Sequence, residues 1–383
     1  MLKTESLEYD LPDDLVAVAP AEPRDAARLL VLSRSDPSRL EHRTVRDLPE
    51  LLDPCDLMVF NRSRVLPARF EGVREDTGGG VEGLYLQDDG APDRWLAMVK
   101  SRRFKRGAPI RLTAPDGIPS PVLLTLNGRH DTGESQDASV EGAWRVTVTR
   151  DDGGPTDAHS VLEAFGLTPL PPYIRAARRR IGMKTGDEPD RAAYQTTYAG
   201  EAKDAHSVAA PTAGLHFTPE LLKQITERGV DRAEVLLHVG AGTFKPVETE
   251  RVEDHPMHRE RCSEGVAGAS INACRARDGR VISVGTTTAR TLESFAKARA
   301  EGNTPGAWME TDLLITPGTH RWRAVDGLMT NFHQQRSTLM AMVAAFLDKD
   351  PGRGAERLLA AYRAAIRERY RFYSFGDAML ILP

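Results

Sequence analysis

Residues 218–239 read TPELLKQITERGVDRAEVLLHV, and this stretch decides the class of fold. Thr218 can cap a helix that has Pro219 at its first position and that stops at Gly229. The apolar run 233–239 that follows has the length and composition of a strand. A capped helix that leads into a strand is the repeating unit of an α/β fold.

The same alternation continues on both sides of this unit. Apolar periodicity predicts further helices at residues 263–277, 287–300, 337–348 and 354–369, and further strands at 29–32, 57–60, 280–286, 311–315 and 378–382. This order predicts a mostly parallel sheet covered by helices. Residues 176–191 are polar and charged, so we expect a mobile loop there.

Between residues 68 and 150 the pattern changes to short β-rich runs without helices. These runs lie at 69–73, 81–87, 95–99, 110–113, 122–126 and 144–149. Turn residues separate them, such as Gly78–Gly80 and Asn127-Gly128. Strands at this spacing indicate a small antiparallel barrel or sandwich, inserted into the α/β domain.

The composition describes an ordinary water-soluble protein. With 383 residues, 28% charged residues and a formal net charge of −4, the whole chain is no generic polyanion binder. Its three cysteines form no CxxC pair and leave an odd thiol, which fits a reducing compartment. No apolar run is long enough to span a membrane. We therefore predict a cytoplasmic protein with no membrane partner.

Two runs of small residues are the strongest functional signal. They are SVAAPTAGLHFT at 207–218 and LHVGAGTF at 237–244. Glycine lets backbone approach a ligand closely, at an entropic cost that a purely structural segment avoids. The two runs, separated by one helix, predict two walls of one pocket, although strand-end loops with ordinary turn glycines remain the alternative. The candidate wall residues are Thr212, Gly214, Gly240, Gly242 and Thr243.

Three histidines are candidates for proton transfer or for polar substrate contacts. His216 and His238 lie inside the two small-residue runs, and His333 follows Asn331 in a stretch predicted to line a pocket. A buried histidine that only binds backbone is the alternative for each. His255 and His258 have the spacing of half a metal site, but no second pair lies nearby, so we predict no metal.

Two further segments can contact a small ligand. Gly285, Thr286 and Thr287 lie between a predicted strand and a predicted helix, where free amides can hold a carboxylate. An unliganded helix cap is equally consistent with this pattern. The charged segment that contains Arg24, Asp25 and Arg28 is consistent with a ligand clamp or with a surface turn.

Two basic runs can contact a polyanion. The first holds Lys100, Arg102, Arg103, Lys105 and Arg106 around one phenylalanine, which suits phosphate contacts with stacking. The second includes Arg178 and Arg179 at the start of the predicted loop. Most basic runs are only solvated faces, but two of them in a chain of net negative charge favour binding of a polyanion.

A set of long motifs carries a resemblance to a known family. The motifs are YDLP (9–12), PAEPRD (20–25), VFN (59–61), RVLPAR (64–69), PPYI (171–174), YQTTYA (194–199), the two small-residue runs, TNFH (330–333), RSTL (336–339) and YRFYSFGDAM (370–379). Together they resemble the S-adenosylmethionine:tRNA ribosyltransferase-isomerases of queuosine biosynthesis. The resemblance spans nearly the whole chain.

The resemblance implies a discontinuous α/β catalytic domain of residues 1–66 and 155–383, with a β-barrel inserted at 67–154. It implies transfer and isomerisation of the ribosyl part of S-adenosylmethionine onto 7-aminomethyl-7-deazaguanine in the anticodon of tRNA. The product is epoxyqueuosine-tRNA, and adenine and methionine leave. S-adenosylmethionine is the co-substrate, tRNA binds through its anticodon arm, and no metal is implied. We expect a monomer.

The motif positions add Asn61 and Arg64 to the candidate substrate-binding residues. Two positions depart from the family. Arg62 stands where members usually carry Asp, and Gln334-Gln335 stands where they usually carry Leu-Pro. A charge reversal and the loss of a rigid proline can alter substrate contacts at those two loops.

Two rival interpretations remain open at the level of sequence. An ordinary S-adenosylmethionine-dependent methyltransferase would release S-adenosylhomocysteine, whereas the family reaction releases adenine and methionine. A non-catalytic RNA-binding module would tolerate the loss of His216 and His238. The small-residue runs are hard to explain by phosphate contacts alone, which favours an enzyme.

Overall fold

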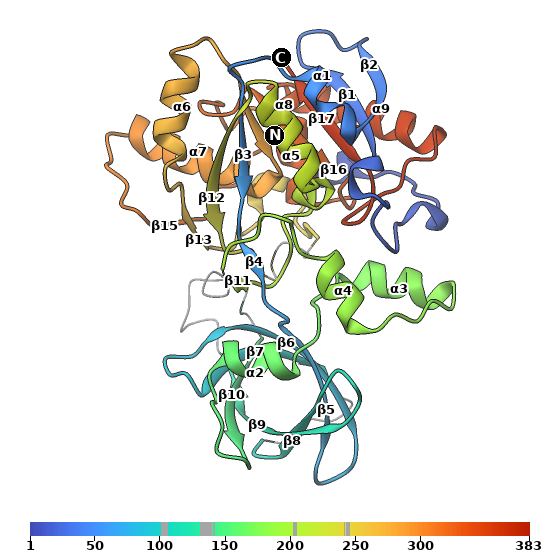
Figure 1. Cartoon of the computed structure of the whole chain (residues 1–383), viewed down its shortest axis with the longest axis vertical. Coiled ribbons are helices and arrows are strands. Elements are labelled where there is room, and N and C mark those ends of the chain that lie inside the picture. Colours follow the sequence, from blue (N-terminus) through green and yellow to red (C-terminus); the bar gives the residue numbers. More distant parts are fainter. Residues whose placement is uncertain (101–105, 131–139, 141, 202–204, 241, 243–245) are drawn as a thin grey trace.

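The computed structural model describes residues 1–100, 106–130, 140, 142–201, 205–240, 242 and 246–383. Figure 1 shows an α/β part at the top and a β-barrel at the bottom. The predicted fold class, α/β with an inserted antiparallel barrel, is confirmed. Four predicted site residues, Arg102, Arg103, Lys105 and Thr243, lie outside the described residues.

The α/β part is built on one large sheet. Among the described residues it has nine strands, in the order β15 (Met309–Thr311), β13 (Glu260–Ser263), β12 (Asp231–Leu237), β3 (Leu57–Asn61), β14 (Val281–Val284), β16 (Gly327–Asn331), β17 (Ala378–Leu382), β1 (Arg28–Ser33) and β2 (Leu40–Thr44). The central strands β12, β3, β14 and β16 pair parallel, as predicted. The pairings at both edges and between β16 and β17 are antiparallel, so the sheet is mixed.

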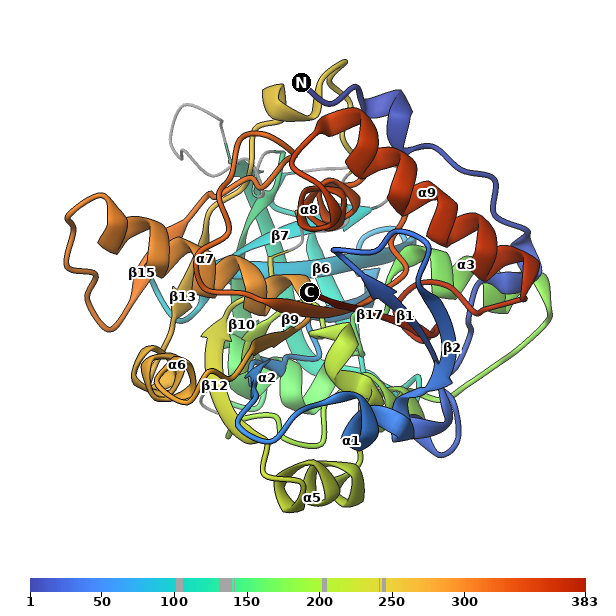
Figure 2. The same cartoon turned by 90° about the horizontal axis from the view of Figure 1, so that it is seen from above.

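Helices cover both faces of this sheet because successive strand residues point to opposite faces. Leu57 and Val59 of β3 pack in the cluster that includes α6 (Ala267–Arg275), α7 (Thr286–Ala300), α8 (Thr338–Leu347) and α9 (Pro351–Arg367). Met58 and Phe60 pack on the other face, with α1 (Leu48–Leu51) and α5 (Pro219–Glu227). Figure 2 shows the two layers on either side of the strands.

The start and the end predicted for the helix α5 are confirmed. The Thr218 hydroxyl accepts a hydrogen bond from the amide of Leu221 at 3.1 Å, and Pro219 is the first helical residue. Gly229 then takes a φ of 90°, a left-handed conformation that favours glycine after a helix end. The helices and strands predicted at 287–300, 337–348, 354–369 and 378–382 are also present, with ends shifted by at most three residues.

Four predicted elements are wrong. The strand predicted at 311–315 lies earlier, as β15 (Met309–Thr311). The loop predicted at 176–191 is two short helices, α3 (Pro172–Arg180) and α4 (Asp187–Ala193). The helix predicted from 263 begins at Ala267, because residues 260–263 pair with β12 as a strand. The turn predicted at Asn127-Gly128 lies within the continuous strand β9, where Asn127 is an extra residue without a partner in the register with β10.

The smaller part is a closed barrel. Its strand order is β10 (Trp144–Arg150), β7 (Arg94–Lys100), β6 (Gly80–Asp88), β5 (Arg69–Arg74), β8 (Pro109–Thr113) and β9 (Pro119–Arg129), and all pairings are antiparallel. Helix α2 (Ala158–Phe165) places Val161 and Leu162 in the barrel's apolar cluster. The exact domain boundaries stay a prediction.

The two parts meet where the chain leaves and re-enters the α/β part. The short strands β4 (Arg64–Val65) and β11 (Ala205–Ser207) pair there, as Figure 1 shows. Next to them, Arg69 and Leu167 exchange two backbone hydrogen bonds, of 3.1 and 2.6 Å. The outgoing and returning segments therefore lie side by side.

Candidate active site

A cavity lies at the edge of the sheet where the parallel strands β14 and β16 end. Open α/β sheets bind ligands at this edge, because the loops that follow the strands converge there. The residues lining this central cavity include six that the sequence predicted, namely Thr212, Gly285, Thr286, Thr287, Asn331 and His333. The two segments before α5 and after β14 thus meet, together with the TNFH motif.

The start of α7 forms one wall of the central cavity. Gly285, with a φ of 92°, turns the chain from β14 into α7, and its amide donates to the carbonyl of Met329. Among the described residues no side chain caps this helix. The first amides of a 15-residue helix therefore remain open, with the positive end of its dipole, and suit a carboxylate.

His216 and Asn331 meet behind this wall. The His216 Nε2 atom and the Asn331 Nδ2 atom are 3.4 Å apart, and both side chains are buried. Burial, together with the positive charges of Arg371 and Arg24, lowers the pKa of His216 to about 4. The Asn331 Oδ1 atom is buried with no hydrogen-bond partner among the described residues. A neutral imidazole and an unused acceptor thus adjoin the cavity.

His333 lines the central cavity directly. Its Nε2 atom lies 2.8 Å from the hydroxyl of Thr330, and its amide donates to the hydroxyl oxygen of Tyr362 at 2.8 Å. The hydroxyl of Tyr9 donates to its carbonyl at 2.5 Å. Burial lowers the pKa of His333 to about 3. The imidazole is therefore neutral at pH 7, and the two tyrosines fix the backbone of His333.

The structure does not bring His238 to the central cavity. Its ring stacks on Trp308, with centroids 5.4 Å apart and planes 6° apart, and meets the edge of His206 at 5.0 Å. The next residue, Val239, lines the cavity. A catalytic role for His238 stays a prediction.

The glycines of the two small-residue runs pack against other parts of the protein. A Cβ on Gly214 would lie 1.9 Å from the Tyr198 hydroxyl, so packing within the protein requires this glycine. The Gly240 amide donates to a carboxylate oxygen of Glu260 at 3.0 Å, and a Cβ on Gly242 would lie 2.7 Å from the His258 ring. None of the three lines the central cavity.

The N-terminal candidates hold neighbouring segments. Arg24 donates to the carbonyl of Gln195 at 2.7 Å, and Arg28 lies 3.8 Å from the ring centroid of Tyr370. The Asp25 carboxylate pairs with exposed Arg46 at 3.4 Å. Ligand contacts by these three residues stay predictions.

Asn61 and Arg64 lie at the start of the segment that leads to the barrel. The Asn61 side chain accepts from the amides of Ser63 and Leu237 and reaches the Thr287 hydroxyl at 3.4 Å. It thereby fixes the end of β12 to the start of α7. Arg64 lines a second cavity, at the junction with the barrel. Of the two departures from the family, Gln334 lines the central cavity.

The basic candidates separate into buried and exposed groups. Arg178 is buried and pairs with Asp190 through two hydrogen bonds of 2.7 and 2.9 Å. Its guanidinium is therefore engaged within the protein, which argues against a phosphate contact. The neighbouring Arg179 is exposed, and Lys100 and Arg106 lie on the barrel.

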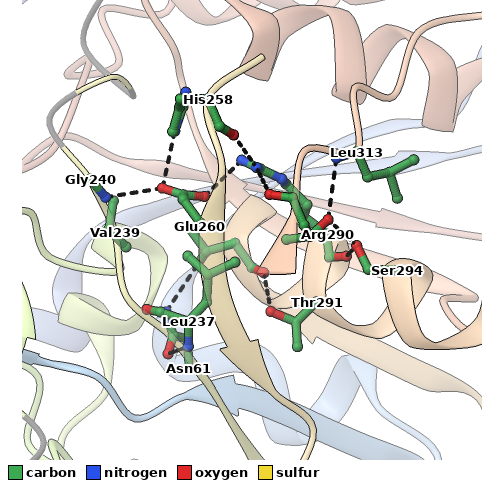
Figure 3. Close-up of polar contacts among 12 residues, drawn as sticks. Asn61, Leu237, Val239, Gly240, His258, Glu260, Arg290, Thr291, Ser294 and Leu313 are labelled. Atoms are coloured by element: carbon green, nitrogen blue, oxygen red, sulfur yellow. Dashed lines mark hydrogen bonds and ion pairs between the residues drawn. The ribbon is translucent and has the colours of Figure 1, made fainter. Parts of the chain in front are cut away.

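Sequence reasoning missed a buried charged cluster beside the central cavity, drawn in Figure 3. Glu260 pairs with Arg290 at 2.7 Å and with His258 at 3.1 Å. Burial raises the pKa of Glu260, but Arg290, His258 and the Gly240 amide outweigh this effect and hold it below its usual value. The sequence singled out His258 only as part of half a metal site. No group of three or more potential metal ligands occurs among the described residues. The only signal for the cluster was two polar residues at a spacing of two, with Glu260 as the first residue of β13.

The chain belongs to the queuosine biosynthesis protein family, whose model matches residues 4–381. It is 44% identical to the S-adenosylmethionine:tRNA ribosyltransferase-isomerase of Moorella thermoacetica, over 100% of both chains. It is 45% identical to the protein of the same name from Gloeobacter violaceus, over 99% of this chain and 96% of the relative. These matches confirm the resemblance found in the motifs.

A solved structure is also similar. The crystal structure of the S-adenosylmethionine tRNA ribosyltransferase from Thermotoga maritima matches with a TM-score of 0.50 and 30% sequence identity. The match covers 98% of this chain and 100% of that chain. In the described part of the present structure, none of the helices is long and apolar enough to cross a membrane.

Proposed function

We propose that this chain is an S-adenosylmethionine:tRNA ribosyltransferase-isomerase. It transfers the ribosyl part of S-adenosylmethionine onto 7-aminomethyl-7-deazaguanine at the wobble position of tRNA, and isomerises it to give epoxyqueuosine-tRNA. The observation that carries this proposal is the full-length match to relatives of that name, at 44–45% identity. The cavity that gathers the motif residues supports it.

The central cavity is the proposed site of S-adenosylmethionine. The open amides at Gly285–Thr287 suit the carboxylate of its methionine part, and Thr212 and Asn331 offer polar contacts to the ribose. A sulfonium acidifies the adjacent 5′ C–H bond, so a neutral imidazole can accept that proton and start the loss of adenine.

His216 and His333 are the bases that the structure supports best. Both are neutral at pH 7. His333 lines the central cavity, and His216 lies behind it, beside the lining residue Asn331. The amine of the modified base then attacks the opened sugar, and methionine leaves as the epoxide closes. No metal is part of this proposal.

The anticodon arm of tRNA is the proposed macromolecular partner. Lys100, Arg106 and Arg179 are described basic residues that suit its phosphates. We further propose that the chain acts in the cytoplasm, as its cysteine content predicts, and that it is a monomer.

The test is to incubate the purified protein with S-adenosylmethionine and tRNA that carries the aminomethyl-deazaguanine. We expect free adenine, free methionine and a modified nucleoside that has gained the ribosyl-derived mass. Release of S-adenosylhomocysteine would identify a methyltransferase instead. Intact S-adenosylmethionine, under conditions where the Moorella relative turns over, would contradict the proposal and point to Arg62 and Gln334.

A further inference from the structure

Glu260, Arg290 and His258 form a buried network, which we call the Glu260 network (Figure 3). The side chains of Glu260, Arg290 and His258 are 2%, 5% and 6% exposed. One carboxylate oxygen of Glu260 accepts from Arg290 at 2.7 Å, and the other accepts from the Gly240 amide at 3.0 Å. The carboxylate therefore joins a helix to a loop.

Arg290 extends the network to two strands. Besides Glu260, its guanidinium donates to the carbonyls of His258 at 3.1 Å and Thr311 at 3.0 Å. Because Arg290 belongs to α7, this one side chain fixes α7 against β13 and β15.

A buried ion pair adds little to the free energy of unfolding, because the cost of taking two charges out of water offsets their attraction. Well-packed apolar residues of similar volume often stabilise a protein equally well. Such a pair does fix the relative position of the segments that it joins, because guanidinium and carboxylate meet only in defined orientations. The segments that the Glu260 network joins therefore indicate its role.

The network lies between two walls of the proposed substrate site. Thr286 and Thr287 line the central cavity, and they also line a smaller adjoining cavity with His258, Glu260 and Arg290. Val239, the residue before Gly240, lines the central cavity from the opposite run. Glu260 thus connects Gly240, next to one wall, to α7, whose first turn forms the other wall.

We propose that Glu260, Arg290 and His258 are positioning residues that hold Gly240, and with it the cavity-lining residue Val239, at a fixed distance from the N-terminus of α7, and thereby set the affinity of the site for S-adenosylmethionine. This inference rests on the proposed function. Gly242 contributes from the loop side, because only a residue without Cβ can pack this closely on the His258 ring.

The test compares two buried carboxylates, Glu260 on β13 and Glu293 on α7. Glu260→Gln keeps an oxygen for the Gly240 amide but removes the charge that holds Arg290. The control is Glu293→Gln on α7, because Glu293 is also fully buried and accepts from the amides of Ala324 and Val325 at 2.8 and 3.1 Å. Glu293 lines neither cavity.

We expect Glu260→Gln to raise the Kd for S-adenosylmethionine about tenfold, the effect of losing one well-placed polar interaction. KM for S-adenosylmethionine should rise similarly, with KM for tRNA unchanged. Glu293→Gln should lower the melting temperature and leave both constants unchanged. Equal Kd values in Glu260→Gln and the wild type would overturn the proposal, as would an equal rise in Glu293→Gln.

Gly242→Ala tests the same inference without a change of charge, in case Glu260→Gln does not fold. We expect the same selective rise in the Kd for S-adenosylmethionine, and an unchanged Kd would contradict the network. The binding measurement also separates this inference from the proposed function. A wild type that binds S-adenosylmethionine but releases no adenine would refute the function and leave the network testable.

Discussion

At the scale of single residues, the two buried histidines have a consequence for stability. The pKa of His216 falls from 6.5 in the unfolded chain to about 4 in the folded protein, and that of His333 falls to about 3. The unfolded chain therefore binds more protons below pH 6.5 than the folded protein does. The contribution of the two histidines to the free energy of unfolding is therefore complete above this pH. It is lost as the pH falls towards the pKa values of the folded protein.

The test is urea unfolding of the wild type and of His216→Gln at pH 7 and pH 5. Because His216 alone accounts for about 2 kcal/mol of the loss over this interval, the wild type should lose about that much more than the variant. Identical losses in the two proteins would show that His216 is not held neutral by the fold.

The residues of the central cavity show how far single positions are predictable. Thr212, Gly285 and Asn331 were predicted because small or polar residues interrupt apolar runs. Glu260 and Arg290 were not, because a charged residue in a strand or helix has the same local pattern whether it is exposed or buried. Only the long-range pairing of β13 with β12 brings Glu260 beside Gly240.

At the scale of elements, α3 shows why a charged segment can fold as a helix. A short sequence rich in arginine is typical of a solvated loop, but in α3 the side chains of Ile174, Ala177 and Arg178 share one buried face. Asp190 of α4 provides the partner that makes burial of Arg178 tolerable. This partner lies 12 residues away, beyond the reach of a periodicity argument.

Two neighbouring arginines of α3 should therefore behave differently. Arg178→Ala leaves Asp190 buried without its partner, so we expect a loss of about 3–5 kcal/mol in the free energy of unfolding. Arg179→Ala should leave stability unchanged and reduce the slope of log K for tRNA binding against log salt by about 1. Denaturant unfolding and salt-dependent binding measure the two effects. A stable Arg178→Ala protein with a reduced salt slope would reverse the two assignments.

Two glycines near the ends of α7 allow a second comparison of matched variants. Gly285 and Gly302 both have left-handed φ angles, of 92° and 81°, at the start and just beyond the end of the helix. Alanine at either position should cost about 1–2 kcal/mol of stability. Only Gly285→Ala should also weaken S-adenosylmethionine binding, measured by calorimetry, because it disturbs the open amides of the cavity. Equal affinities in both variants would remove the helix N-terminus from the site.

At the scale of the whole molecule, basic residues of the barrel are expected to share the binding of tRNA with the α/β part. Replacing both Lys100 and Arg106 by alanine should weaken tRNA binding and reduce its salt slope by about 2, because each charge releases about one counterion. The affinity for S-adenosylmethionine should not change. Lys223→Ala on α5, 77% exposed, is the control. An unchanged slope in the double variant would exclude the barrel patch as a phosphate contact.

The arrangement of the two parts was predictable from the change of pattern near residues 68 and 150. The helix α2, which packs against the barrel, was not predicted, because its 8 residues span only about two turns and show little periodicity. The antiparallel edges of the sheet were missed for a related reason. Strands of three or four residues, such as β13 and β15, are too short to show a period.

The paired segments at Arg69 and Leu167 bear on how such a molecule can arise and be altered. Because the chain enters and leaves the barrel through adjacent points, a gene fragment that encodes the barrel can be gained, lost or exchanged without changing the strand order of the sheet. The barrel is therefore a module in the genetic sense, free to diverge while the loops at the edge of the sheet are kept.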